Sequence, residues 1–142
     1  MVLSHNRFTL LNRSANELFD YARANGMAVI NAAPYAGGVL AKGSAQVAKI
    51  TYQDVDASKL EPVRRIEQIC ATHAIAQGAA ALQFSLQDPR VTSTVVGVSK
   101  PERVAQTLGW AGQDIPAAAW AALMQLDYAA EDPEAMRVYK PG

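Results

Sequence analysis

The chain has 142 residues, the length of one ordinary domain, and 50% of them are hydrophobic, which is enough for a sizeable core. The chain has 13 lysine and arginine residues and 13 aspartate and glutamate residues, so its net charge is zero. It therefore has no overall electrostatic field that would attract nucleic acid or an acidic membrane. The single cysteine, Cys70, excludes an intramolecular disulfide framework and is expected to be a buried thiol rather than a nucleophile. Because no basic segment precedes an apolar run and no stretch of about 18 apolar residues occurs, we expect neither a signal peptide nor a transmembrane helix, and a cytoplasmic protein.

The first 33 residues have the pattern of strand, helix and strand. Residues 2–5 predict a strand directly after the initiator methionine, and residues 14–17, SANE, have the form of a capping box at a helix start. Gly26 is placed to end that helix in a left-handed conformation. Residues 27–32, MAVINA, are apolar on both sides except at Asn31, as is typical of a buried parallel strand.

The segment after that strand is the first candidate for ligand contact. Residues 33–38, APYAGG, let backbone approach a ligand closely, and the carboxyl end of a parallel strand is where α/β folds bind ligands; a plain loop is the alternative. Residues 39–57 are mixed in character and predict mostly a surface excursion. Residues 58–61 repeat the capping-box pattern, and apolar side chains at helical spacing from Val63 to Cys70 predict a helix after them.

The second half of the chain predicts more helices around one further strand. Gly78 interrupts the helical pattern, after which the alanine-rich residues 79–84 predict a helix that ends before Asp88. A strand at 91–98, a helix from residue 101 and a helix at 116–126 follow. Three strands, each followed by helix, imply a parallel sheet with right-handed crossovers, either open or forming an arc of a barrel.

Residues 91–108, VTSTVVGVSKPERVAQTL, combine a strand, a turn and a helix start. Pro101 suits the first helical position, and the free N–H groups of a first helical turn favour an anion. Ser99, Lys100 and Arg103 add a hydroxyl and two cations at the same point. The segment therefore predicts a phosphate site.

The chain resembles the carboxyl-terminal part of an aldo-keto reductase, most closely the sugar dehydrogenases that oxidise aldoses such as fucose or other threo-aldoses. Four segments carry the resemblance in the correct order: 6–13 (NRFTLLNR), 29–38 (VINAAP with the Gly-Gly pair), 79–84, and 95–103 (VVGVSKPER). The family fold is a (β/α)8 barrel, which typically needs ~250 residues. The resemblance therefore implies one incomplete domain, residues 1–142, that holds the last three βα units of a barrel and an irregular tail at 128–142. A rearranged open parallel sheet flanked by helices is the alternative.

The resemblance also implies that the chain binds a nicotinamide dinucleotide, NADP or NAD. The family binds this cofactor without the Gly-rich sequence fingerprint of other dinucleotide-binding proteins, and this sequence has no such fingerprint. Several family members have a lysine where Gly97 stands, so both cofactors stay open. The implied cofactor-binding residues are Gly97, Ser99, Lys100 and Arg103 at the adenosine phosphate, Gln106 and Thr107 near the adenine, Ala33 and Gly37 at the pyrophosphate, and His5 and Ala32 at the nicotinamide. His5 stands where the family usually has a glutamine, and Ala32 where many members have a stacking aromatic ring.

The resemblance implies that the catalytic machinery lies outside this sequence. The family's tetrad of aspartate, tyrosine, lysine and histidine comes from the first four barrel strands, and the tyrosines at positions 35, 52, 128 and 139 lie outside that motif. We therefore assign no catalytic residue and no metal ligand to this chain.

These implications lead to three functional hypotheses. The first is the cofactor-phosphate-binding part of an NAD(P)-dependent carbonyl or aldose oxidoreductase, inactive alone, with a missing amino-terminal half as its partner. The second is a non-catalytic nucleotide-binding or regulatory module, and the third is a degenerate remnant without a ligand. Because an arc of a barrel exposes strand edges and its inner face, we expect the isolated chain to be molten or self-associated.

Overall fold

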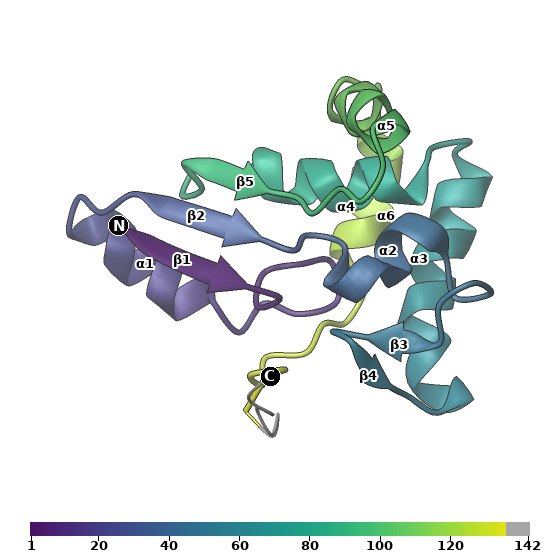
Figure 1. Cartoon of the computed structure of the whole chain (residues 1–142), viewed down its shortest axis with the longest axis horizontal. Coiled ribbons are helices and arrows are strands. Elements are labelled where there is room, and N and C mark those ends of the chain that lie inside the picture. Colours follow the sequence, from purple (N-terminus) through teal and green to yellow (C-terminus); the bar gives the residue numbers. More distant parts are fainter. Residues whose placement is uncertain (136–142) are drawn as a thin grey trace.

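The computed structural model describes residues 1–135, and the part of the predicted tail from 136 to 142 lies outside the described residues. Strands β1 (Val2–His5), β2 (Val29–Ala32) and β5 (Ser93–Val95) form a parallel sheet in the order β1-β2-β5 (Figure 1). The prediction of three parallel strands is confirmed. β5 is shorter than the predicted 91–98, because its last ladder bond, from the Ala33 amide to the Val95 carbonyl, leaves the next residues free to turn away.

Helices lie against one face of this sheet and beyond its carboxyl end, and a small hairpin also lies beyond that end (Figure 1). The remaining elements are α1 (Asn16–Ala24), a 3-10 turn (Ala36–Gly38), α2 (Val39–Lys42), the antiparallel pair β3 (Lys49–Ile50) and β4 (Gln53–Asp54), a second 3-10 turn (Ala57–Leu60), α3 (Glu61–Thr72), α4 (Gln77–Leu86), α5 (Glu102–Ala111) and α6 (Ala117–Met124). Within the described residues, no helix is long and apolar enough to cross a membrane.

Both predicted capping boxes are wrong. α1 begins without a side-chain cap, because the Ser14 hydroxyl donates instead to Asn12 Oδ1 at 2.7 Å. α3 also lacks a side-chain cap, since the 3-10 turn Ala57–Leu60 occupies the expected helix start. The predicted end of α1 is confirmed: Gly26 has φ +64°, and its amide donates to the Arg23 carbonyl at 3.1 Å.

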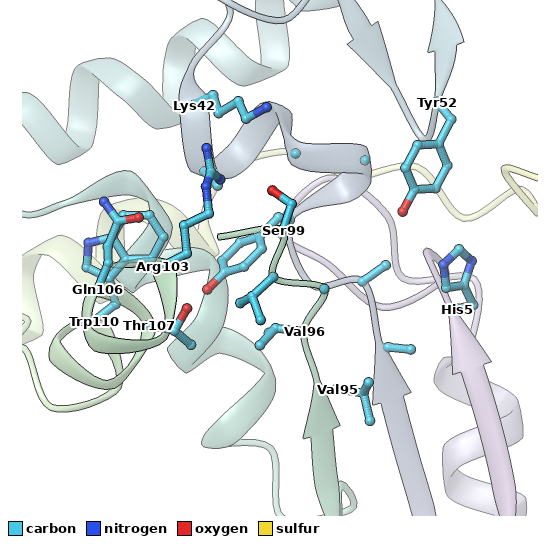
Figure 2. A pocket seen from close by; sticks show the side chains of 18 residues that line it. His5, Lys42, Tyr52, Val95, Val96, Ser99, Arg103, Gln106, Thr107 and Trp110 are labelled. Carbon is cyan, nitrogen blue, oxygen red and sulfur yellow. The ribbon is translucent and has the colours of Figure 1, made fainter. Parts of the chain in front are cut away.

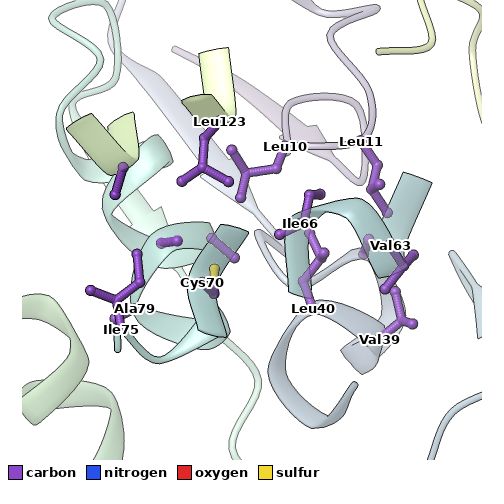
Figure 3. Close-up of a cluster of buried hydrophobic side chains, with 14 of the residues drawn as sticks. Leu10, Leu11, Val39, Leu40, Val63, Ile66, Cys70, Ile75, Ala79 and Leu123 are labelled. Carbon is purple, nitrogen blue, oxygen red and sulfur yellow. The ribbon is translucent and has the colours of Figure 1, made fainter. Parts of the chain in front are cut away.

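The main core lies between the helices, at one end of the sheet (Figure 3). Val39 and Leu40 are completely buried in it, whereas most other residues of 39–57 are exposed or half-buried, so the predicted surface excursion is confirmed except at α2. An apolar pair in a four-residue helix is too short to show a helical period. Cys70 also lies in this core, and burial, with a smaller contribution from Glu67, raises the pKa of its thiol to about 11. The prediction of a buried thiol is confirmed.

Helices cover one face of the sheet and leave the other open. On the covered face, Asn31 donates to Ser85 Oγ on α4 at 2.8 Å, and Ser85 bonds Thr94 Oγ1 of β5 at 2.7 Å. A second, smaller cluster under this face consists of Phe8, Ala15, Phe19, Ala22 and Val29. On the opposite face the side chains of Leu3 and Val95 are 62% and 48% exposed.

Gly78 does not interrupt a helix, contrary to the prediction, but lies in the first turn of α4. The break comes at Ala74, which takes φ +53° and lets the Ile75 amide bond the Cys70 carbonyl at 3.0 Å. Gly78 is required by packing, since a Cβ there would come within 2.4 Å of the Trp110 ring on α5. This close approach fixes α5 against α4.

We expect Gly78→Ala to lower the free energy of unfolding by about 1–3 kcal/mol, because Trp110 would have to move. The matched control is Gly109→Ala in α5, where a Cβ meets no atom within 4 Å. In that variant the free energy of unfolding should rise by about 0.5–1 kcal/mol, because alanine has a higher helix propensity than glycine. Urea unfolding at one chain concentration measures both, and equal effects of the two substitutions would contradict the packing argument.

Arg90 connects the turn before β5 to α1. Its guanidinium bonds Asp88 Oδ2 at 2.7 Å, Asp20 Oδ1 at 2.8 Å and Asn16 Oδ1 at 3.0 Å. Burial raises the pKa of the Asp88 carboxyl, but the hydrogen bonds from Arg90 outweigh burial, so the pKa lies below its ordinary value. This pair therefore stabilises the fold above the unfolded pKa of aspartate, about 3.9, and that contribution is lost as the pH falls through the lower folded value.

We expect Arg90→Gln to lower the free energy of unfolding at neutral pH by about 1–3 kcal/mol, since Asp88 loses its charged partner. The difference from the wild type should shrink as the pH falls below about 4 and through the lower folded pKa of Asp88. The exposed helical pair of Arg65 with Glu61 provides the control, because Arg65→Gln should cost less than about 0.5 kcal/mol at either pH. Denaturant unfolding at several pH values measures these differences, and a pH-independent effect of Arg90→Gln would refute the assignment.

Candidate functional site

A cavity of about 540 Å³ opens at the carboxyl ends of the three parallel strands (Figure 2). Its walls come from the strand ends, the loop after β2, α2, the tip of the β3–β4 hairpin and the first turns of α5. This is the edge at which α/β proteins with parallel strands bind ligands, and the volume suits a small organic ligand or part of a larger one.

The cavity brings together all of the predicted site residues except Lys100. Those that line it are His5, Ala32, Ala33, Gly37, Gly97, Ser99, Arg103, Gln106 and Thr107. Lys100 is exposed and does not belong to the lining, because the turn into α5 directs it to solvent. Side chains from three separate strand-loop segments therefore share one space.

The start of α5 has backbone amides available to an anion. α5 has 10 residues and begins at Glu102, one residue later than the predicted start at Pro101. The amides of Arg103 and Val104 are already bonded to carbonyls of the preceding turn. Within residues 1–135, the amides of Ser99, Lys100 and Glu102 donate to no protein acceptor. These amides and the Arg103 side chain form an anion-binding arrangement next to the cavity.

Lys42 is a second cation in the cavity lining that the sequence analysis missed. It ends α2, in the segment predicted to be a surface excursion. In Figure 2, Lys42, Arg103 and Ser99 lie around one part of the cavity, away from His5 and Tyr52. A basic residue shortly after the glycine pair was the one available signal in the sequence, and only the fold of α2 brings it to the cavity.

Tyr52 reaches the cavity through a close backbone contact. A Cβ on Gly37, which has φ +75°, would lie 2.7 Å from the Tyr52 amide nitrogen. The Thr51 amide donates to the Ala36 carbonyl at 3.1 Å, and Thr51 and Tyr52 have φ values of +50° and +68°. These left-handed conformations are uncommon for side chains of this size. The loop after β2 thus holds the hairpin tip at the cavity.

Aromatic rings line both ends of the cavity. At one end, Tyr35 meets Trp110 edge to face, with ring centroids 5.8 Å apart. Burial raises the pKa of the Tyr35 phenol, and the Thr107 hydroxyl lowers it in part. At the other end the rings of His5 and Tyr52 are nearly parallel, at an angle of 11° and a centroid distance of 6.1 Å. The arrangement suits a ligand with an anionic group and planar rings.

Two solved structures show the same fold. They are the apo and holo forms of aldo-keto reductase AKR11C1 from Bacillus halodurans, which superpose with TM-scores of 0.68 and 0.66 at 17% and 16% sequence identity. Each covers 97% of this chain, and this chain covers 47% and 45% of them. At these identities the likeness establishes the fold alone.

Sequence comparison identifies the family. Pyridoxal 4-dehydrogenase from Microbacterium luteolum is 33% identical over 118 residues, and D-threo-aldose 1-dehydrogenase from a Pseudomonas species is 31% identical over 127 residues. These matches cover 82% and 88% of this chain but 34% and 39% of the two relatives. A model of the aldo/keto reductase family matches residues 1–127. The chain therefore belongs to the aldo/keto reductase family.

Proposed function

We propose that this chain is the cofactor-binding, carboxyl-terminal part of an NAD(P)-dependent oxidoreductase and supplies the last three βα units of a (β/α)8 barrel. The observation that carries the proposal is the cavity at the strand ends, with its anion-binding helix start and two cations. The chain spans only 34–39% of the curated relatives that it matches, which supports a missing part.

The open side of the sheet supports the same proposal. Within the described residues, β1 and β5 each pair with β2 alone, so both outer edges of the sheet present unpaired backbone groups. The exposed Leu3 and Val95 lie on the face that no helix covers. In a barrel that face points inward and both edges are paired. Further strands from an amino-terminal part would satisfy both requirements, and without them we expect the folded chain to self-associate through these edges.

The residues of the cavity fit a nicotinamide dinucleotide. Gly97 and Gly38 line the cavity, and a Cβ at either position would meet no atom within 4 Å, so the backbone there is open to a ligand. The free amides near Ser99, together with Arg103 and Lys42, would hold phosphate groups. When bound, the dinucleotide supplies the hydride donor or acceptor.

The remaining lining residues would order the two ends of the cofactor. In this proposal Gln106 and Thr107 contact the adenine, Ala33 and Gly37 the pyrophosphate, and His5 and Ala32 the nicotinamide. Lys100 would act only through its backbone amide. The choice between NADP and NAD depends on whether Arg103 and Lys42 together hold a 2′-phosphate.

We propose an aldose or a related aldehyde as the substrate class, following the names of the two relatives. The acid–base group for the carbonyl oxygen would come from the amino-terminal part of the barrel. None of the four tyrosines within residues 1–135 is assigned that role, and Tyr139 lies outside the described residues. The chain alone would therefore bind cofactor without turnover.

We expect Arg103→Ala and Lys42→Ala each to weaken NADPH binding about tenfold, because each removes a charged contact to phosphate. If the two side chains hold a 2′-phosphate, the loss for NADH should be smaller. Fluorescence titration with both dinucleotides measures the change. The control is Arg64→Ala, an exposed arginine on α3 outside the cavity lining. Equal, unchanged affinities in all variants would refute the phosphate site.

A mixing experiment tests directly whether this chain needs a separate amino-terminal part for activity. We expect no turnover by this chain alone, and NAD(P)-dependent aldose oxidation when it is combined with the amino-terminal part of the D-threo-aldose 1-dehydrogenase relative, ending where the similarity begins. Absorbance at the reduced nicotinamide band measures turnover, and Arg103→Ala in the same mixture is the control. Dinucleotide binding without activity in any mixture would favour a non-catalytic module. A melting temperature that no dinucleotide raises at millimolar concentration would favour a remnant.

A further inference from the structure

The carboxyl-terminal segment 127–135 returns to the end of β1 and is fixed there by its backbone. The Ala129 amide donates to the Leu11 carbonyl at 2.9 Å, and its carbonyl accepts from the Arg13 amide at 2.8 Å. Asn12 Nδ2 donates to the Glu131 carbonyl at 2.8 Å, and Arg7 pairs with Asp132 at 2.8 Å. These contacts bring the next carboxylate, Glu134, beside the first residues after the strand.

Three polar atoms meet at that point. Glu134 Oε1 lies 3.1 Å from His5 Nδ1 and accepts from Asn6 Nδ2 at 2.8 Å, while the two nitrogens are 3.2 Å apart. Asn6 is completely buried. A rotated Asn6 amide would place its oxygen against the carboxylate, so the amide nitrogen must face Glu134.

The carboxylate determines which ring nitrogen of His5 carries the proton. An ionised carboxylate only accepts hydrogen bonds. An unprotonated Nδ1 at 3.1 Å would therefore place its own lone pair against a lone pair of Glu134 Oε1. The Asn6 amide nitrogen can only donate, so its 3.2 Å contact to Nδ1 would favour a bare Nδ1, but its shorter contact, 2.8 Å, goes to Glu134. With Asn6 donating to Glu134, the favourable arrangement has a proton on Nδ1 that is also donated to Glu134. The tautomer of a histidine is set by the hydrogen bond that one of its nitrogens makes, which leaves Nε2 of His5 as a bare acceptor.

We propose that Glu134 is a positioning residue that holds His5 in the Nδ1–H tautomer and so presents Nε2 to the cavity as a hydrogen-bond acceptor. His5 lines the cavity, whereas neither Glu134 nor Asn6 belongs to the lining. An acceptor at this place selects a ligand group that carries an N–H. The identity of this group rests on the proposed function: it is the carboxamide NH₂ of the nicotinamide.

The tautomer can be observed without any ligand. The chain has two histidines, so the Nδ1 and Nε2 signals of ¹⁵N-labelled His5 are assigned with a His73→Gln variant. At about pH 8, where imidazole is neutral, the His5 shifts should show a protonated Nδ1. Glu134→Ala should abolish that signature, and Glu134→Gln should keep it, because the amide oxygen still accepts. Glu131→Ala is the matched control, since its contact to Asn12 uses the backbone carbonyl.

An Nε2–H tautomer in the wild-type chain, or the same spectrum in Glu134→Ala, would overturn the proposal. A chain without fixed structure would give the averaged imidazole signals of free histidine at both positions, which also overturns it. Because no dinucleotide is present, this outcome is independent of the proposed function.

The consequence for the ligand is measured with two cofactors. The acetylpyridine analogue of NAD has an acetyl group in place of the carboxamide and therefore lacks the N–H donor. We expect the wild-type chain to bind NAD ~5-fold more tightly than the analogue, and Glu134→Ala to lose that preference. Equal preference in both proteins would overturn the assigned acceptor. If neither cofactor binds, the proposed function fails while the tautomer result still decides the role of Glu134.

Discussion

The central strand β2 is the constraint on which the candidate site depends. It pairs in parallel with both neighbours, and the register aligns His5 with Ala32 and Ala32 with Val95. The three chain segments therefore leave the sheet at the same edge. The segments that begin at Ala33 and Val96, directly after these partners, line the cavity. A shift of one residue in either pairing would turn alternate side chains to the other face and separate the lining residues.

The loop after β2 converts this edge into an enclosed space. Ala33 and Ala36 take left-handed conformations with φ of +60° and +49°, which cost roughly 1–2 kcal/mol for residues other than glycine. The buried Val39 and Leu40, which follow directly, hold the loop in place against this cost. The same loop packs against the hairpin tip at Gly37, so one strained segment places both Tyr52 and Lys42 in the cavity lining.

Local patterns predict the parts of this fold that depend on local interactions. The strand at 2–5, the left-handed Gly26 and the apolar face of α3 follow from alternation, backbone sterics and helical spacing. The capping box at Ser14 fails because the Ser14 hydroxyl donates instead to Asn12 Oδ1, two positions earlier. Lys42 and Tyr52 could not be predicted, since their positions depend on contacts between distant backbone segments.

The two faces of the sheet differ in a way that connects stability to the site. On the covered face, the side chains of Asn31, Ser85 and Thr94 form a chain of hydrogen bonds between the sheet and α4. The other face carries the exposed Leu3 and Val95, and its end leads into the cavity at His5 and Ala32. Any polypeptide that covers this face would therefore also close the end of the cavity at His5 and Ala32. Such a polypeptide would lower the local dielectric around His5 and strengthen its hydrogen bond to Glu134, so assembly would also affect the orientation of this cavity residue.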